Sequence, residues 1–413
     1  MYHYLYPFQP RSLAVFAIVY ACCAVLALIA PAQAGRREWL LVATWLVAGL
    51  LSQAVIRQLT PFSLEQMFVS DGSNGFYTAA RQYHPAELLS NFDRLRVTFE
   101  SVHARGNMPG KTLLAYGLGL LSSRPAVQAW LVVVLSNAGG VLLYLFVRDY
   151  LGDRDTALVA LIFYLFVPAK LVFFPVLNTI SPVLVLGCAW LWLRLLQSRA
   201  IAYALALGVS VYVTVFYEPT LAVMGVLFLL LTAHAWLRAE VDWRTGMRLT
   251  GFAILGFAAI YAVVVAWLGF DLLTTLREIG RDAVAFNART NRPYGAWVVR
   301  NPIDFLFGVG VSQAALFCGS VAYACFHATR VRRAASKPAA LTLGIAAALV
   351  AADLVGVNRG EVIRLWIFLA CFAQIPAAYV VAQLDNRGAL ILAIGATLLQ
   401  DVLSTSMLAF ASP

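Results

Sequence analysis

The chain alternates between long apolar runs and short polar connections over most of its length. Runs of roughly 15 to 22 apolar residues match helices that cross a bilayer, because each residue rises about 1.5 Å and the hydrocarbon core is about 30 Å thick. Twelve such runs are predicted, over 13–33, 38–57, 126–147, 156–174, 180–196, 200–216, 219–237, 249–269, 304–326, 339–355, 362–382 and 388–408. The pattern therefore predicts an all-α polytopic membrane protein with about 12 transmembrane helices, in which residues 1–413 form a single integral-membrane domain.

The first apolar run has a second interpretation as a signal peptide, because the small residues Ala32 and Ala34 follow it. The preceding segment carries Arg11 as its basic residue, and a second apolar run follows at once. A retained membrane helix is the prediction that fits this order.

Two long polar segments interrupt the apolar pattern. The first, 58–125, contains SDGSNGFYTAARQYHPAELLSNFDRLRVTFESVHARGNMPGK at 70–111, the longest polar stretch in the chain. Connections between spans are usually short, so this segment is predicted to be a catalytic loop. Its end, KTLLAYGLGLLS at 111–122, is too short to cross a bilayer and is predicted to be a membrane-surface helix.

The second long segment, 270–303, mixes five arginines with Phe286, Tyr294 and Trp297. This mixture is typical of interfacial helices that lie against lipid headgroups. The alternative is that one or two of these arginines hold a lipid phosphate.

The short loops carry the basic residues that set orientation in a membrane. These residues are Arg36, Arg37, Arg148, Arg154, Arg194, Arg199, Arg238, Arg244, Arg248, Arg330, Arg332, Arg333, Lys337 and Arg387, and all fall on one side of the predicted spans. Because Lys and Arg favour the cytoplasmic side, both long loops and both termini are predicted to be extracytoplasmic.

Composition supports a membrane protein and excludes several other classes. The chain is 62% hydrophobic and 12% charged, against a charged fraction of about 25% in soluble domains. The net charge of +10 is spread in small groups, so no nucleic-acid partner is predicted. All six cysteines lie within apolar runs without a CxxC motif, which indicates neither a disulfide framework nor a zinc site.

A third polar stretch, GVNRGEVIRLWIFL at 356–369, places charges at the mouth of the eleventh span. Glu361 and Arg364 are i,i+3 neighbours on one helical face, with Arg359 just before them. An arginine inside an apolar run is costly, so Arg364 is a candidate functional residue whose partner is Glu361 or a phosphate. The alternative is that Arg364 only extends from a helix end to the interface.

Other polar residues lie on the same predicted side. Glu218 and Asn178 stand at the ends of spans, where each is either a cap residue or part of a site. His84 and His103 have no metal-ligand spacing, so no histidine metal centre is predicted. A divalent cation held by oxygens of Asp71 and Glu218 remains an alternative.

These segments resemble the GT-C superfamily of integral-membrane glycosyltransferases, which use polyprenyl-phosphate-linked sugars. The resemblance rests on a first large loop that opens with FVSDGSNGFYTAARQY, continues into NMPGKTLLAYGLGLL and is followed by paired spans. The resemblance lies in the order of spans and loops, and it extends over most of the chain. Members include aminoarabinose, arabinosyl and mannosyl transferases.

The resemblance implies a GT-C-like fold with extracytoplasmic juxtamembrane helices in the first loop, in a bacterial inner or plasma membrane. The implied reaction transfers a sugar from a polyprenyl-phosphate donor to a hydroxyl of a glycan, lipid or protein acceptor, with inversion and without a cofactor. Asp71 matches the catalytic aspartate and is the expected general base. The expected donor-phosphate ligands are Lys111, Arg359 and Arg364, and the expected supporting or acceptor residues are Glu218, Glu361, Asn178 and His103.

The chain departs from the family pattern at three points. Two spans precede the loop where one is usual, Gly72 follows Asp71 where a second acid is frequent, and Asn178 stands where several relatives have an aspartate. Asp71 also has a structural interpretation, as the cap of the helix that follows it.

Two other classes remain open. A transporter or lipid flippase would also be twelve-helical, but such proteins place ionisable residues at the midplane and often have repeated halves, and neither feature is clear here. A scaffold protein of the cell envelope would not need charges that converge on one face. A phosphate-binding loop at GNMPGK is excluded, because the first glycine of that motif is missing at the required spacing.

Overall fold

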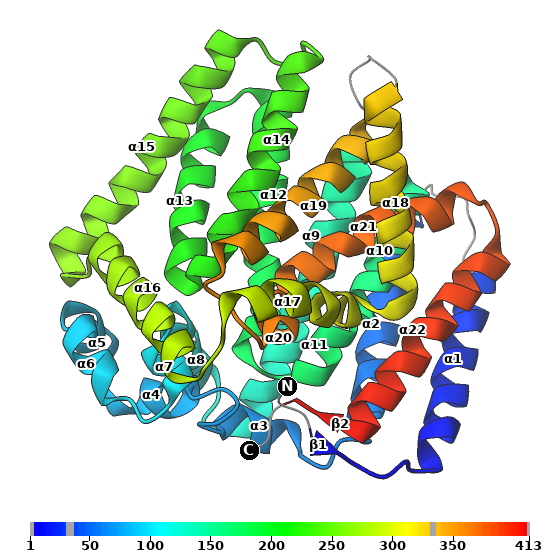
Figure 1. Ribbon diagram of the computed structural model, residues 1–413, viewed down its shortest axis with the longest axis horizontal. Helices are drawn as coiled ribbons and strands as arrows, with labels where there is room; N and C mark the ends of the chain where they lie inside the picture. Colours follow the sequence, from blue (N-terminus) through cyan, green and yellow to red (C-terminus); the bar gives the residue numbers. More distant parts are fainter. Residues whose placement is uncertain (1–3, 30–36, 331–335, 411–413) are drawn as a thin grey trace.

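The chain folds into an all-α assembly with one small pair of strands, in a computed structural model that describes residues 4–29, 37–330 and 336–410 (Figure 1). Before the first long loop lie β1 (Tyr4–Leu5), α1 (Arg11–Ile29) and α2 (Glu38–Arg57). The first long loop holds α3 (Leu64–Val69), α4 (Phe76–Gln82), α5 (Pro85–Ser90), α6 (Phe92–Leu95), η1 (Arg96–Thr98), α7 (Val102–Arg105) and α8 (Gly110–Leu121). The predicted surface helix near 111–122 is therefore α8.

The central part of the chain contains α9 (Pro125–Leu151), α10 (Arg154–Leu165), α11 (Pro168–Phe173), η2 (Leu177–Ile180), α12 (Ser181–Ser198), α13 (Ile201–Tyr217), η3 (Pro219–Val223), α14 (Met224–Leu237) and α15 (Trp243–Leu268). The remainder contains α16 (Leu272–Arg289), α17 (Tyr294–Val309), α18 (Val311–Arg330), α19 (Lys337–Val355), α20 (Val362–Leu365), α21 (Ile367–Gln383), α22 (Arg387–Met407) and β2 (Leu408–Ala409). Polar caps start several of these helices, because Asp153, Asp242 and Asp271 each accept hydrogen bonds from the first free backbone N–H groups.

Nine helices or helix runs in the described ranges are long and apolar enough to cross a membrane, or ten if the bent pair α17–α18 is one span. Two shorter apolar helices, α13 and α21, coincide with two more of the predicted runs. An all-α polytopic membrane protein is therefore confirmed by length and composition. The number twelve stays a prediction.

The run predicted as one span over 304–326 is divided at Gly310. The chain bends by 117° between α17 and α18, and Gly310 has a φ of 106°, which residues with a Cβ rarely adopt. The Gln400 side chain bridges the two sides of the break. It accepts from Val311 N at 2.7 Å and donates to Phe307 O at 2.9 Å.

The helices differ strongly in how much they are enclosed. The 18-residue window within Arg154–Phe173 is 94% buried, whereas that within Trp243–Leu268 is 11% buried. α10 and α11 therefore lie in the centre, and α15 presents apolar side chains outward, as a helix in contact with lipid does.

The basic short loops gather at one end of the molecule. There Arg148 contacts Glu38 at 2.9 Å, Arg194 contacts Asp149 at 3.1 Å and Lys337 contacts Glu240 at 3.6 Å. At the other end lie α3–α8, α16 and the antiparallel pair β1–β2, which joins the two chain ends (Figure 1). The basic short loops and the long loops thus lie at opposite ends of the molecule, as predicted. The side of the membrane that each end faces stays a prediction. Arg36, Arg332, Arg333, Ala32 and Ala34 lie outside the described residues.

Candidate functional site

A tight turn presents Asp71 between α3 and α4. The backbone N–H groups of Asn74 and Gly75 both donate to Ser70 O, at 2.9 and 2.8 Å. Gly75 has a φ of 68°, and a Cβ there would lie 1.8 Å from Ser101 Oγ. The turn therefore requires glycine at this position, both for its backbone conformation and for the approach of Ser101.

Three side chains from elsewhere in the chain hold the carbonyl groups of this turn. Ser101 Oγ donates to Asp71 O at 2.9 Å, and His103 Nε2 lies 2.9 Å from Gly72 O. Arg364 Nη1 donates to Ser73 O at 3.4 Å. α7 and α20 thus position the turn, although α20 is far away in the sequence.

The carboxylate of Asp71 is incompletely satisfied. Its Oδ1 is buried, and within the described residues it has no hydrogen-bond partner. Nearly all buried polar atoms in folded proteins are paired, so an unpaired carboxylate oxygen at the tip of a constrained turn indicates a place for a ligand.

Arg364 links this turn to Glu361 and His103. Its Nη2 donates to Glu361 Oε2 at 2.5 Å and lies 3.2 Å from His103 Nδ1. Arg364 Nη1 also lies 3.1 Å from His103 Nε2, so both ring nitrogens face the guanidinium, which favours a neutral ring. The Arg364 guanidinium and burial lower the pKa of His103 to about 3. Burial would raise the pKa of Glu361, but the Arg364 and Arg292 guanidinium groups hold it below its ordinary value.

Arg292 joins Glu361 to the second long loop. Arg292 Nη2 donates to Glu361 Oε1 at 3.1 Å, and its Nη1 donates to Arg359 O at 2.6 Å. Arg359 itself donates to Arg292 O at 2.9 Å and to Gly356 O at 2.9 Å. Arg359, a predicted phosphate ligand, is therefore bound to backbone carbonyls in this structure.

Lys111 and Glu218 form a second cluster beside the first. Lys111 Nζ lies 3.1 Å from Glu218 Oε2, and the two side chains are 0% and 2% exposed. Asn178 Nδ2 donates to Glu218 Oε1 at 2.9 Å, and the Ser181 hydroxyl donates to Oε2. Burial lowers the pKa of Lys111 although Glu218 opposes this, and Arg364 lowers it further, so the two clusters share one electrostatic environment.

The structure thus brings together most of the predicted site residues. Asp71, His103, Glu361 and Arg364 form the first cluster, and Lys111, Glu218 and Asn178 form the second. Sequence reasoning missed Ser101 and Arg292. The signal for Ser101 was weak, because a serine in a polar loop commonly caps a helix or stabilises a turn. Arg292 was not singled out, because it is one of several arginines in the second long loop.

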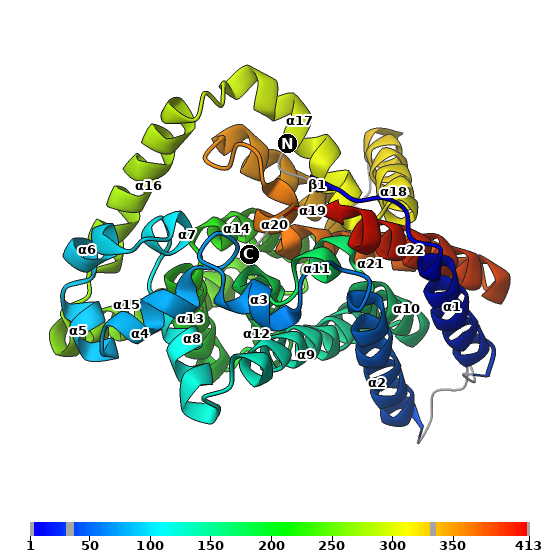
Figure 2. The same cartoon turned by 90° about the horizontal axis from the view of Figure 1, so that it is seen from below.

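A buried arginine that sequence reasoning also missed joins the two long loops. Arg96 contacts Glu278 at 3.1 Å and Asp282 at 2.6 Å, and its own side chain is 4% exposed. Thr275 Oγ1 donates to Asp93 Oδ2 at 3.1 Å beside it. These contacts hold α16 against the first long loop (Figure 2).

No group of three or more His, Cys, Asp or Glu side chains with metal-binding geometry occurs in the described ranges. Glu218 uses its oxygens for Lys111, Asn178 and Ser181. A divalent cation on Asp71 and Glu218 stays a prediction, and it would require Glu218 to exchange partners.

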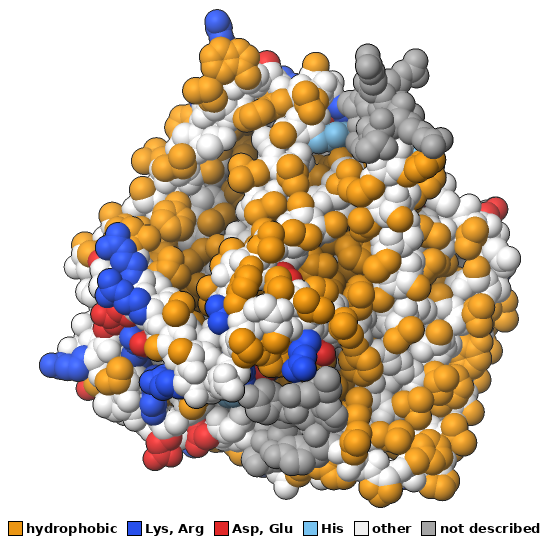
Figure 3. All heavy atoms as spheres, viewed as in Figure 1, with side chains coloured by type: hydrophobic (Ala, Val, Ile, Leu, Met, Phe, Trp, Pro, Cys, Tyr) orange, Lys and Arg blue, Asp and Glu red, His pale blue; other side chains and the backbone are white. Residues whose placement is uncertain are grey.

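Arginines mark the surface around the loops. In Figure 3 basic side chains gather over α16, whose exposed arginines include Arg277 and Arg281, whereas apolar side chains cover much of the remaining face. This distribution is typical of a helix at the boundary between lipid and water.

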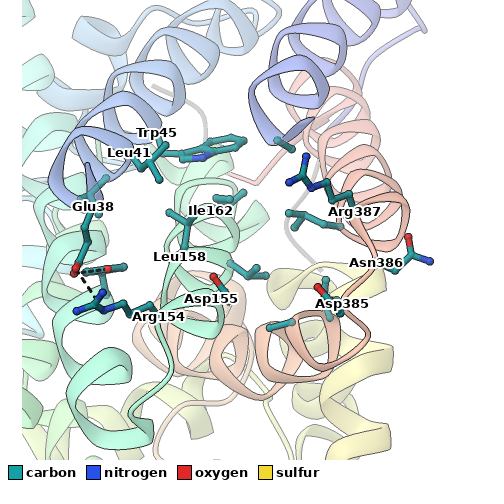
Figure 4. A pocket seen from close by; sticks show the side chains of 17 residues that line it. Glu38, Leu41, Trp45, Arg154, Asp155, Leu158, Ile162, Asp385, Asn386 and Arg387 are labelled. Atoms are coloured by element: carbon teal, nitrogen blue, oxygen red, sulfur yellow. Dashed lines mark hydrogen bonds and ion pairs between the residues drawn. The ribbon is translucent and has the colours of Figure 1, made fainter. Parts of the chain in front are cut away.

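A separate cleft of about 140 Å³ lies at the end that carries the basic loops (Figure 4). Glu38, Arg154, Asp155, Asp385 and Arg387 line it. Glu38 accepts from the Tyr144 hydroxyl at 2.6 Å and lies 3.5 Å from Arg154. Because Glu38 is already paired and the cleft is remote from the Asp71 turn, it is not part of the candidate site.

No family model matches this chain, and no curated protein sequence matches it either. The site geometry therefore carries the functional argument.

Proposed function

We propose that the protein is a membrane glycosyltransferase of the GT-C type. It moves a sugar from a polyprenyl-phosphate donor to an acceptor hydroxyl on a glycan, lipid or protein, at the extracytoplasmic face of a bacterial inner or plasma membrane. The observation that supports this function best is the Asp71 carboxylate, whose buried Oδ1 has no hydrogen-bond partner within the described residues although three side chains fix its turn. Such an oxygen is suited to accept a hydroxyl proton.

In the proposed reaction the acceptor oxygen attacks the anomeric carbon while its proton passes to the Asp71 carboxylate. The bond from that carbon to the donor phosphate oxygen breaks, and the phosphate leaves with the electron pair. The configuration inverts, because attack and departure occur on opposite faces. A phosphate leaves as an anion, so one carboxylate can suffice, whereas hydrolysis of an ordinary glycoside requires a second carboxyl group as an acid.

Cations beside the turn support recognition of the donor phosphate. Arg364 contacts the turn directly, and its Nε is buried without a partner in the described parts of the chain. Charge-assisted hydrogen bonds to phosphate are about twice as strong as neutral ones. Arg364 is the favoured ligand of the three proposed, because it contacts the Asp71 turn and keeps Nε without a partner in the described residues although its Nη2 pairs with Glu361.

The test uses the purified full chain in lipid vesicles, with polyprenyl-phosphate mannose and polyprenyl-phosphate arabinose as probe donors. Asp71→Asn preserves size and loses the proton acceptor, so we expect donor binding to persist and sugar transfer to fall about 10²-fold or more. Glu87→Gln, a carboxylate change at an exposed position of the same loop, is the matched control and retains transfer. Transfer by Asp71→Asn above about a tenth of the parental rate would exclude Asp71 as the base.

A transporter is the second candidate, and buried charges within spans favour it. Asp401 in α22 is fully buried, and neither carboxylate oxygen has a partner among the described residues. Lys170 is also fully buried, where Nζ donates to Asn137 Oδ1 at 3.2 Å. Ionisable residues inside spans often mark transport paths. Movement of the donor lipid between leaflets without sugar transfer, abolished by Asp401→Asn and not by Asp71→Asn, would favour this function.

A further inference from the structure

A cavity of about 380 Å³ lies where α2 ends and α9 begins. Its walls are formed by the last residue of α2, by residues 58 and 60–65, which run into the start of α3, and by two residues from the first turns of α9. Figure 2 shows α3 crossing beside α9 at this end of the molecule. The cavity is built from elements that do not contribute Arg364, Glu361, His103 or Lys111, so it is distinct from the site proposed above.

Arg57 supplies a buried cation to this cavity. The residue is 8% exposed, and within the described chain its guanidinium forms neither an ion pair nor a hydrogen bond. Only its backbone carbonyl is engaged, by the Thr60 N–H at 3.3 Å and the Thr60 hydroxyl at 2.9 Å. Burying a charge without a partner is unfavourable, so a guanidinium whose Nε is buried and unpaired in the described residues favours an anion in the cavity.

The position of Arg57 identifies the kind of anion. It is the last residue of a helix long and apolar enough to cross a membrane, which is the depth at which lipid phosphates lie. An arginine that only extended into the headgroup layer would be exposed, and Arg57 is not. The Trp130 ring on the cavity wall is partly exposed, as interfacial tryptophans are.

Other polar groups on the wall suit a phosphate headgroup. The exposed side chains of Gln58 and Ser63 bring an amide and a hydroxyl to the cavity. Glu65 also lines it, but this residue is exposed and forms no ion pair with Arg57. Because water screens an exposed carboxylate, Glu65 does not neutralise the buried guanidinium.

We propose that the Arg57 cavity binds the phosphate of an anionic membrane lipid, with the guanidinium as its principal ligand and the acyl chains along the apolar surfaces of α2 and α9. A planar guanidinium matches two phosphate oxygens at once. The proposal does not depend on glycosyl transfer, and its test measures binding alone.

The test is binding of dihexanoyl phosphatidylglycerol to the purified full chain in a neutral detergent, followed by native mass spectrometry and by the thermal unfolding midpoint. We expect saturable binding that raises the midpoint of the parent protein, and affinity at least tenfold weaker for Arg57→Gln. Arg124→Gln is the matched control, because Arg124 is exposed just before α9 and does not line the cavity. This control should bind like the parent.

Further measurements test whether the cavity recognises the lipid phosphate through Arg57. Inorganic phosphate at millimolar concentration should fail to displace the lipid. Full displacement would show that the cavity binds free anions and is not specific for a lipid. Dihexanoylglycerol, which lacks the phosphate, should not bind. Arg57→Gln should unfold no earlier than the parent in lipid-free detergent, because the guanidinium has no partner to lose. Equal lipid affinity of parent and Arg57→Gln would overturn the proposal.

Discussion

Lys111 and Glu218 lie where neither side chain reaches water, so each depends on the other for neutralisation. Glu218→Gln removes the negative charge and leaves a buried ammonium group, which typically costs about 3–5 kcal/mol of unfolding free energy. The double change Lys111→Met with Glu218→Gln removes both charges and should recover at least half of that loss. Thermal unfolding in detergent measures the comparison, and a double variant as unstable as the single one would contradict it.

His103 makes stability depend on pH in a defined direction. Its pKa is about 3 in the folded protein and about 6.5 in an unfolded chain. Below pH 6.5 the unfolded state therefore binds a proton that the folded state does not, and stability falls as the pH falls from 6.5 towards 3.

Between pH 7 and pH 5 the parent should lose on the order of 2 kcal/mol more unfolding free energy than His103→Gln, which cannot titrate. Glutamine retains an N–H that can donate to Gly72 O. The measurement is a pair of denaturation curves for each protein at the two pH values. Parallel losses in the two proteins would show that His103 titrates in the folded state as it does in the unfolded chain.

At the scale of elements, the two long loops behave as one layer because Arg96 joins η1 to α16. Arg96→Met leaves Glu278 and Asp282 as like charges four residues apart on one helical face, an arrangement that disfavours the helix. We expect backbone hydrogen exchange in 272–289 to increase at least tenfold while the spans remain protected. Arg277→Met, an exposed arginine on the same helix, is the control and should leave exchange unchanged.

Local sequence signals predicted most of the helices and part of the site. Apolar runs report spans because each helix satisfies its own backbone hydrogen bonds, whatever its neighbours are. The break at Gly310 was not predicted in this way, and the Gln400 side chain that hydrogen-bonds to both sides of it lies in another helix. Asp71 was identified from its polar loop and the family resemblance. The role of Arg96 was not, because its partners lie 182 and 186 residues further along the chain.

At the scale of the whole molecule, the distribution of Lys and Arg predicts which end faces the cytoplasm. Basic loops favour the cytoplasmic side, so a reporter inserted after Asp153 should read as cytoplasmic and one inserted near Asn91 as extracytoplasmic. An insertion after Arg333 should also read as cytoplasmic, and one near Asn287 as extracytoplasmic. The topology is wrong if Asn91 and Arg333 report the same side.

The contact between Arg364 and Ser73 spans 291 positions of the chain. During synthesis the Asp71 turn leaves the ribosome long before α20 exists, so a nascent chain has the carboxylate without the arginine that holds the turn. The site is therefore completed only when nearly all of the helices have been inserted. A ribosome-stalled or truncated product that ends before residue 364 would lack the guanidinium that contacts Ser73 O, so its Asp71 turn would be less constrained than in the whole chain.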